Sequence, residues 1–314
     1  MKSQRIAITG GTGFVGRHLA RALVAQGHTV ALIARGVDVR DPDITQVAGA
    51  DFFPIGTADV SQLKRAFAGC DSVAHCAGIN RELQAGDYER LHVQGTANVL
   101  EAAADAGLRK IVLLSFLRAR PNCGSPYHET KWQAEELVRQ GQLDYTILKS
   151  GMIYGRGDHM LDHLSHTLHT VPLFGAVGFR EKPICPVAMK DVVRIILASL
   201  LDGRLSRQTV AVRGPEFIPL SEAVRRVGQV IGKPPLIFPM PVAAHCAMAI
   251  VCERLMKIPL VSLAQIRMLA EGFAEPGPGC DPLPDDLAPK TDFTEESIRE
   301  GLPAPGPFTV ADLR

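Results

Sequence analysis

The stretch R5-I-A-I-T-G-G-T-G-F-V-G16 runs from a short apolar segment through spaced glycines into a segment, 15–26, with helical apolar spacing. It predicts a strand, a tight turn and a helix. Gly10 can make the turn, Gly13 lets the backbone approach a pyrophosphate, and Gly16 permits close packing of helix on strand. The amino end of the helix presents free N–H groups to phosphate. This order predicts dinucleotide binding; the alternative is a glycine-rich structural turn.

The second predicted strand, T29-V-A-L-I-A-R35, selects the form of the dinucleotide. An acidic residue at its end would accept hydrogen bonds from a free ribose 2′-hydroxyl, whereas an arginine accommodates a 2′-phosphate. Arg35 stands there, and the nearest following acid is Asp38. The sequence thus predicts NADP(H) in preference to NAD(H), unless Arg35 only caps a sheet edge in solvent. The predicted cofactor contacts in these segments are Gly10, Gly11, Thr12, Gly13, Phe14, Val15, Gly16 and Arg35.

Near-continuous apolar strands alternate with amphipathic helices through the first half of the chain. Further strands are expected at 72–78, 110–116 and 144–150. This pattern is typical of a parallel sheet covered on both faces. We therefore predict an α/β fold, with a doubly wound parallel (Rossmann-type) sheet and a smaller C-terminal substrate lobe. The dinucleotide-binding domain is expected at 1–155. The lobe, 156–314, is expected to be mainly helical, with some segments crossing back to the sheet, including the Pro/Gly-rich tail 272–290.

The composition describes an ordinary globular protein in a reducing compartment. The 314 residues carry a net charge of +1, so no basic excess points to nucleic acid. The seven cysteines form no C-x-x-C pair, which argues against disulfides or a zinc site. No signal-peptide core is visible, and the longest apolar run, 239–252, is short for a membrane span. We expect a cytoplasmic protein without a transmembrane segment. Segment 240–257 is either a packed helix or a surface that meets a protein or a membrane.

A candidate catalytic pair lies in S125-P-Y-H-E-T-K131. Tyr127 and Lys131 are four residues apart, so they share one face of the helix expected at 127–140. A phenol with a pKa of about 10 is a poor acid or base at neutral pH, and a nearby ammonium would lower that pKa. Ser115 ends a predicted strand at the edge where ligands bind, and would donate a hydrogen bond to an oxyanion. The alternative is a surface Tyr and Lys on an amphipathic helix.

Several motifs occur together in an order seen in one superfamily. They are T9-G-G-T-G-F-V-G16, A58-D-V60, V73-A-H-C-A-G78, L91-H-V-Q-G-T-A-N98, Tyr127-x-x-x-Lys131 and M152-I-Y-G-R-G-D158. Over roughly residues 5–230 the chain resembles the extended and atypical short-chain dehydrogenases/reductases. The short interval from Ser115 to Tyr127 is most similar to the atypical branch that contains the NADPH-binding accessory subunit of respiratory complex I and its bacterial relatives. One departure is Lys149-Ser150, where extended members commonly have Arg-Pro.

The resemblance implies roles for individual residues. Tyr127 would exchange a proton with a substrate hydroxyl or carbonyl, and Lys131 would also hold the nicotinamide ribose. Asp59 and Val60 would lie near the adenine, and the Ala77–Gly78 turn would pass under the cofactor. The implied function is NADP(H)-dependent hydride transfer to or from a carbonyl or alcohol of an unidentified small molecule. The alternatives are a non-catalytic NADPH-binding structural or assembly protein, and a nucleotide-sugar epimerase or dehydratase. The oligomeric state is not indicated.

Three histidines share one face of the helix expected at 158–169. His159, His163 and His166 stand at i, i+4 and i+7. Two helical turns separate the first from the last, too far for one metal ion on a straight helix. We therefore predict no metal site. The face is either solvated or forms a polar wall of the substrate cleft.

Overall fold

The computed structural model describes residues 3–37, 41–255, 263–272 and 274–307. The chain divides into two compact units. Unit 1 comprises Met1–Ser150, Met189–Val212 and Pro276–Ala288, and unit 2 comprises Gly151–Ala188, Arg213–Glu275 and Pro289–Arg314. The chain therefore leaves unit 1 at Ser150, close to the boundary predicted at 155, and returns to it twice.

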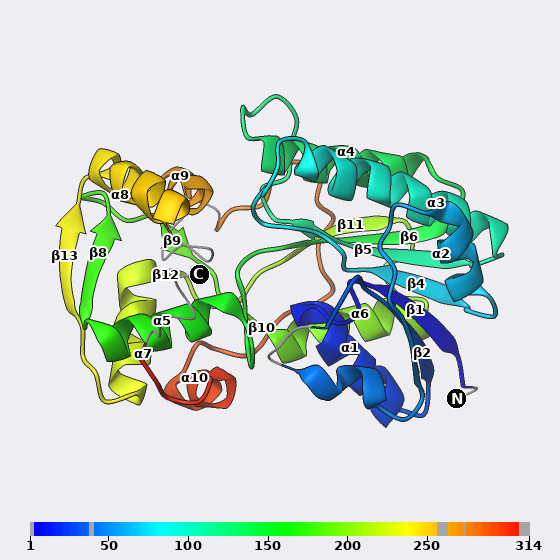
Figure 1. Ribbon diagram of the computed structural model, residues 1–314, viewed down its shortest axis with the longest axis horizontal. Helices are drawn as coiled ribbons and strands as arrows, with labels where there is room; N and C mark the ends of the chain where they lie inside the picture. The colour runs from blue at the N-terminus through cyan, green and yellow to red at the C-terminus, as the bar shows by residue number, and fades with distance from the viewer. Residues whose placement is uncertain (1–2, 38–40, 256–262, 273, 308–314) are drawn as a thin grey trace. The chain divides into compact units, whose positions relative to one another are not determined.

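Unit 1 is built on a seven-stranded sheet in the order β11-β6-β5-β4-β1-β2-β3 (Figure 1). All neighbouring strands pair in parallel. The strands are β1 (Arg5–Thr9), β2 (Thr29–Ile33), β3 (Ala50–Phe53), β4 (Ser72–His75), β5 (Lys110–Phe116), β6 (Asp144–Ser150) and β11 (Gln208–Val212). The predicted doubly wound parallel sheet is confirmed. Strand order reverses between β1 and β4, which is where ligands bind in sheets of this kind.

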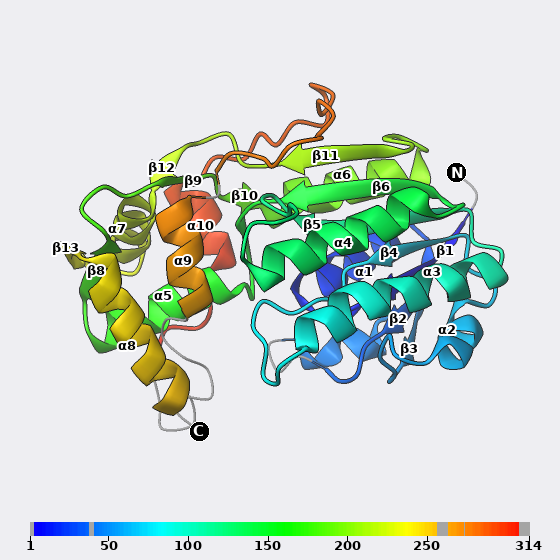
Figure 2. The same ribbon diagram turned by 90° about the horizontal axis from the view of Figure 1, so that it is seen from above.

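Helices cover both faces of this sheet. They are α1 (Phe14–Ala25), α2 (Val60–Phe67), α3 (Gly95–Asp105), α4 (Pro126–Gln140) and α6 (Met189–Leu201), with a 3₁₀ turn at Pro42–Gln46 and a π-helical turn at Glu89–Gln94. Helix α1 packs beside α6 on one face, while α2, α3 and α4 follow one another on the other (Figures 1 and 2).

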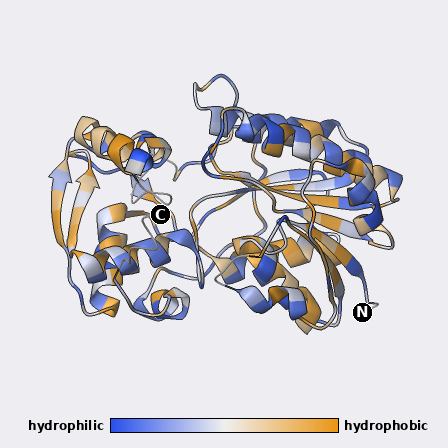
Figure 3. Cartoon of the chain, in the orientation of Figure 1, coloured by the Kyte–Doolittle hydropathy of each residue, from blue (hydrophilic) through white to orange (hydrophobic). Residues whose placement is uncertain are grey.

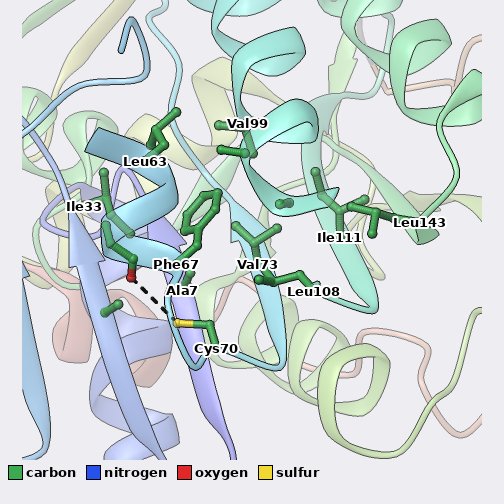
Figure 4. Close-up of a cluster of buried hydrophobic side chains, with 14 of the residues drawn as sticks. Ala7, Ile33, Leu63, Phe67, Cys70, Val73, Val99, Leu108, Ile111 and Leu143 are labelled. Atoms are coloured by element: carbon green, nitrogen blue, oxygen red, sulfur yellow. Dashed lines mark hydrogen bonds between the residues drawn. The ribbon is translucent and has the colours of Figure 1, made fainter. Parts of the chain in front are cut away.

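Apolar side chains fill the layer between the sheet and α2–α4. Phe67 lies at the centre of this cluster, fully buried among Leu63, Val73 and Val99 (Figure 4). Full burial of such a side chain stabilises the fold by about 1.5–3 kcal/mol. The strands of the large sheet also carry many hydrophobic residues, coloured orange in Figure 3, and these belong to the buried core. The layer fixes the carboxyl ends of β4 and β5 relative to α4.

Segment Pro276–Ala288, here called the strap, lies within the tail predicted at 272–290. It runs beside the edge strand β11 (Figure 2), where the backbone N–H of Asp281 donates to the Thr209 carbonyl at 2.6 Å and the Asp281 carboxylate accepts from the Thr209 N–H. Gly277 N–H donates to Leu117 O. The strap thus covers backbone groups that an edge strand would otherwise expose.

Unit 2 combines helices with short strand pairs. Its described helices are α5 (His159–Thr170), α7 (Leu220–Val230), α8 (Val242–Leu255), α9 (Leu263–Glu271) and α10 (Glu295–Gly301). Its described strand pairs are β7 (Ile153–Tyr154) with β10 (Val187–Ala188), β9 (Pro183–Ile184) with β12 (Ile218–Pro219), and β8 (Leu173–Val177) with β13 (Leu236–Met240). Helix α8 is apolar on several sides and exposes Met248, Ile250 and Val251. None of the described helices has the length and apolarity needed to cross a membrane. Residues 256 and 257 of the predicted contact segment lie outside the described residues.

Candidate active site

The glycine turn between β1 and α1 is packed too tightly for side chains. Gly10 has φ +69°, and a Cβ there would lie 2.8 Å from the backbone nitrogen of Ala77. A Cβ on Gly16 would collide with the carbonyl oxygen of Gly10. Among the described residues, no side chain caps the amino end of α1. The turn therefore leaves the first N–H groups of α1 to a ligand, as phosphate recognition requires.

The neighbouring turn residues join this cradle to the end of β2. Gly11 N–H donates to Ile33 O at 3.1 Å, and the Thr12 hydroxyl donates to Gly36 O at 2.7 Å. Phe14 and Val15 begin α1, with Val15 buried. The predicted cofactor contacts at 10–16 thus lie in one turn that is hydrogen-bonded to the end of β2 and the residues after it.

Arg35 follows β2 and its side chain is exposed. Its aliphatic carbons lie beside Gly56, where an added Cβ would stand 3.3 Å from Cγ. The guanidinium also helps to lower the pKa of Asp87, although backbone N–H groups of Gln84 and Leu83 have the larger effects. Because Gly56 has no side chain, the aliphatic part of Arg35 can lie against it.

Asp59 is the helix cap of α2. Its carboxylate accepts from the N–H of Gln62 at 3.0 Å and from the Gln62 side-chain amide at 2.7 Å, and these bonds lower its pKa. Val60 opens the helix and packs against the apolar cluster. Asp59 thereby fixes the segment that the resemblance assigns to the adenine.

The turn after β4 meets the glycine turn on one side and α4 on the other. Ala77 touches Gly10, as described above. A Cβ on Gly78 would lie 2.9 Å from Lys131 Nζ and 3.6 Å from His92 Nε2. The structure therefore brings Lys131 to the same edge of the sheet as the glycine turn.

Tyr127 lies in a cluster of rings. Its ring centroid is 5.3 Å from that of Phe116, 5.5 Å from Tyr88 and 5.7 Å from His92, and its hydroxyl donates to Asn80 Oδ1 at 3.3 Å. Burial raises the pKa of Tyr127, and Tyr88 raises it further. The prediction that Lys131 lowers this pKa is therefore wrong.

Lys131 sits one helical turn further along α4. Its ammonium donates to Leu114 O at 3.4 Å. Burial lowers its pKa to about 8, against an opposing effect of Glu135. The pair therefore consists of a phenol held protonated and an ammonium that titrates near neutrality.

Ser115 is not directed towards this pair. Its buried hydroxyl donates to Glu135 Oε1 at 2.5 Å, while the next residue, Phe116, contacts Tyr127. Glu135 is a strong acceptor because it is fully buried and ionic, with Lys149 as a further partner at 3.2 Å. The structure thus gives Ser115 a place in a buried polar network, and its role as an oxyanion donor stays a prediction.

His92 is a site residue that the sequence prediction missed. It lies in the π-helical turn, with Nδ1 3.0 Å from the Thr130 hydroxyl and Nε2 3.2 Å from Ile79 N. Nε2 also lies 3.1 Å from Ile79 O, so the ring meets both backbone polar groups of Ile79. Burial lowers the pKa of His92 to about 3, so the ring is neutral. The ring clamps the turn after β4 onto α4; the only sequence signal was its place in L91-H-V-Q-G-T-A-N98.

The histidine face lies on α5 in unit 2. His166 Nδ1 donates to Asp162 O at 2.7 Å and approaches its carboxylate at 3.7 Å. Across the residues that the structure describes, no group of three or more His, Cys, Asp or Glu side chains could hold a metal ion. His166 therefore bonds within its own helix.

Comparisons with known proteins agree with this geometry. Residues 10–165 match the sequence model of a family described as NAD(P)H-binding. An uncharacterised protein of Mycobacterium tuberculosis is 28% identical over 263 residues, which cover 84% of this chain but only 27% of that protein. The chain thus spans about a quarter of the length of this relative.

Two relatives of named activity and one solved structure are also similar. The ceramide reductase of Caulobacter vibrioides is 34% identical over 157 residues, covering 49% of this chain and 47% of that protein. The photosystem II assembly factor Ycf39 of Synechocystis is 26% identical, covering 76% and 71%. The crystal structure of UDP-glucuronic acid 4-epimerase from Bacillus cereus superposes with a TM-score of 0.70 at 17% identity, covering 95% and 97%. The chain thus shares the Rossmann-type fold of this solved structure, and its residues 10–165 resemble an NAD(P)H-binding family, as the similarity to short-chain dehydrogenases/reductases led us to expect.

Proposed function

We propose that this chain, an NAD(P)-binding protein of the extended and atypical short-chain dehydrogenase/reductase type, is an NADP(H)-dependent oxidoreductase that reduces a carbonyl group of a small molecule. The observation that carries the proposal is that Lys131 lies against Gly78, next to the glycine turn, while the His92 ring lies close to both Gly78 and Tyr127. The relative named as a ceramide reductase supports the reductive direction.

The residues present fit a nicotinamide dinucleotide. Its pyrophosphate would bind at the turn, where a Cβ on Gly10 or Gly16 would fill the cradle. The Lys131 ammonium would donate to the nicotinamide ribose, and Arg35 would pair with a 2′-phosphate. When bound in reduced form, the cofactor supplies a hydride to the carbonyl carbon.

Tyr127 supplies the matching proton. Its O–H bond breaks as the carbonyl oxygen becomes an alcohol, and water then reprotonates the phenolate. Burial raises the pKa of Tyr127, so the phenol is protonated at neutral pH but depends on a neighbouring cation to release its proton. Lys131, cationic below a pKa of about 8, would stabilise the phenolate that forms.

The test is a turnover assay on the purified protein. NADPH oxidation would be followed at 340 nm against a panel of aliphatic, aromatic and long-chain ketones and aldehydes. We expect Tyr127→Phe to lower kcat by roughly 10²-fold or more while NADPH affinity stays within about twofold. Tyr145→Phe, on β6, is the matched control and should keep wild-type turnover. Turnover that survives in Tyr127→Phe would contradict the assignment.

A second candidate is a non-catalytic NADPH-binding assembly protein. Two observations favour it: the Ser115 hydroxyl is bound to Glu135, and α8 exposes Met248, Ile250 and Val251, which could contact a protein or a membrane surface. The similarity to a photosystem II assembly factor is also consistent with this role. The discriminating measurement is the rate at which bound NADPH leaves when chased with excess NADP⁺. Release within seconds supports turnover, whereas retention for hours supports the assembly role.

A further inference from the structure

A cavity of about 320 Å³ lies within unit 1, between α4, the loop after β5 and the strap. The side chains that matter to its chemistry are Arg120, Trp132, Glu135, Glu136, Arg139 and Lys149. At about 100° per residue, Trp132, Glu136 and Arg139 point about 80–180° around α4 from Tyr127 and Lys131, with Glu135 between the two sets. The lining of the cavity contains none of the predicted cofactor contacts, so the cavity is distinct from the cofactor site. Its volume is at the lower end of the range for small-molecule pockets, about 300–1,000 Å³.

The lining carries an excess of positive charge. Three of the six side chains are cationic and two are anionic. Glu135 is fully buried and accepts from Arg139 Nη2 at 2.8 Å and from Lys149 at 3.2 Å, and Glu136, with 35% of its side chain exposed, contacts Arg139 Nη1. Arg120, half-buried at the mouth, donates to Arg118 O. One negative charge from a ligand would balance this set.

Lys149 has one hydrogen-bond donor left for such a ligand. Its side chain is 1% exposed, and its ammonium donates to Ala119 O at 2.6 Å and to Glu135 Oε2 at 3.2 Å. An ammonium has three N–H donors. The third therefore has no acceptor among the described residues. A buried donor without an acceptor costs about 1–3 kcal/mol, so the cavity favours a guest that accepts this bond.

We propose that this cavity binds a small planar carboxylate, held through its charge by Lys149 and Arg120 and through its apolar part by the Trp132 ring. Arginine matches a carboxylate with two parallel N–H donors. The indole offers the large flat apolar surface of the lining, and rings prefer such a partner. Glu136 at the rim opposes dianions, which restricts the class to monoanions.

Binding of a carboxylate in this cavity would alter the electrostatics of the cofactor site. Glu135 is shared between the two: it holds Lys149 in the cavity, and its charge acts on the pKa of Lys131 one turn away on α4. A carboxylate that draws Lys149 or Arg139 from Glu135 would strengthen the effect of Glu135 on Lys131. This consequence follows only if the carboxylate binds, and binding does not require that the protein be an oxidoreductase.

Trp132 is the only tryptophan of the chain, so its emission reports on this cavity. In the experiment, benzoate is titrated into the full chain in the presence of saturating NADP⁺. The NADP⁺ occupies the cofactor site, so a change in emission cannot come from benzoate binding there. We expect a saturable change in Trp132 emission with a midpoint in the millimolar range, and no saturable change with benzamide, which has the ring without the charge.

Variants assign the binding to the cavity. Arg120→Ala should weaken benzoate binding roughly tenfold or more, because one charge-assisted contact is lost. Glu136→Gln should strengthen it, because the opposing charge at the rim is removed. The control is Arg109→Ala, which removes the same charge from a side chain that is 75% exposed and outside the lining. It should bind as the wild type does.

Four results would each overturn the proposal. The first is the absence of a saturable emission change, and the second is equal binding of benzamide. The third is competition with NADP⁺, and the fourth is unchanged benzoate affinity in both Arg120→Ala and Glu136→Gln. Since no turnover is read, such a failure leaves the oxidoreductase proposal untouched.

Discussion

Removing the charge of Glu135 should destabilise unit 1 severely. This fully buried carboxylate accepts from Ser115, Arg139 and Lys149, and Lys149 is itself 1% exposed. Glu135→Gln keeps the shape but leaves two cations facing a neutral amide. Breaking one side of a buried pair costs about 3–5 kcal/mol. Since 1 kcal/mol shifts the Tm of a domain of 150–250 residues by about 2–4 °C, we expect a fall of about 6–20 °C.

The neighbouring residue provides the matched control. Glu136 also contacts Arg139, but 35% of its side chain is exposed, so Glu136→Gln should cost less than about 1 kcal/mol. Trp132 stands on the same helix and is the chain's only tryptophan, so its emission follows the unfolding of unit 1 in urea or heat. Equal stability of the two variants would refute the claim that Glu135 anchors a buried ionic network.

Four further predictions concern the cofactor site. Arg35→Asp should reverse the preference for NADPH over NADH, measured as the ratio of the two Kd values; an unchanged ratio would remove the 2′-phosphate role. Gly78→Ala should weaken NADPH binding roughly tenfold or more with little loss of Tm, because its methyl group would displace the Lys131 ammonium from 2.9 Å and cost one charge-assisted bond. NADPH affinity should fall as pH rises through about 8, where Lys131 loses its charge, and Lys131→Arg should flatten that profile, as equilibrium titrations at several pH values would show. The same depressed pKa makes Lys131 bind fewer protons in the folded than in the unfolded protein between about pH 8 and its ordinary value of 10.5. The contribution of Lys131 to stability therefore rises with pH across that window. If Lys131 instead lowered the Tm as the pH rises from about 8 to 10.5, the assignment of a depressed pKa would be contradicted.

Local patterns predicted the parts of the fold that short segments determine. The strand–glycine turn–helix at 5–26 and the i, i+4 placement of Tyr127 and Lys131 on α4 both follow from neighbours in sequence. The pairing of β8 with β13 joins residues about sixty positions apart, which no local pattern indicates.

The site contacts that the sequence did not indicate have a common physical origin, because each involves a partner remote in sequence. Ser115 stands at the correct edge, but Glu135, from the middle of α4, takes its hydroxyl. The Tyr127 phenol was expected to feel Lys131, whereas rings from the π-helical turn and β5 desolvate it. His92 was missed because its role depends on Ile79 and Thr130, which lie on either side of it in sequence.

The interleaved path of the chain has a consequence for biogenesis. The edge strand β11 pairs with β6 only after unit 2's first segment has been made, and the strap reaches β11 later still. At about 5–20 residues per second, translation from Ser150 to Val212, the end of β11, takes roughly 3–12 seconds. During that interval the nascent sheet presents β6 as an open edge on the ribosome. A fragment that stops near residue 155 would keep that edge permanently, so we expect such a fragment to associate with itself instead of folding as an independent cofactor-binding domain.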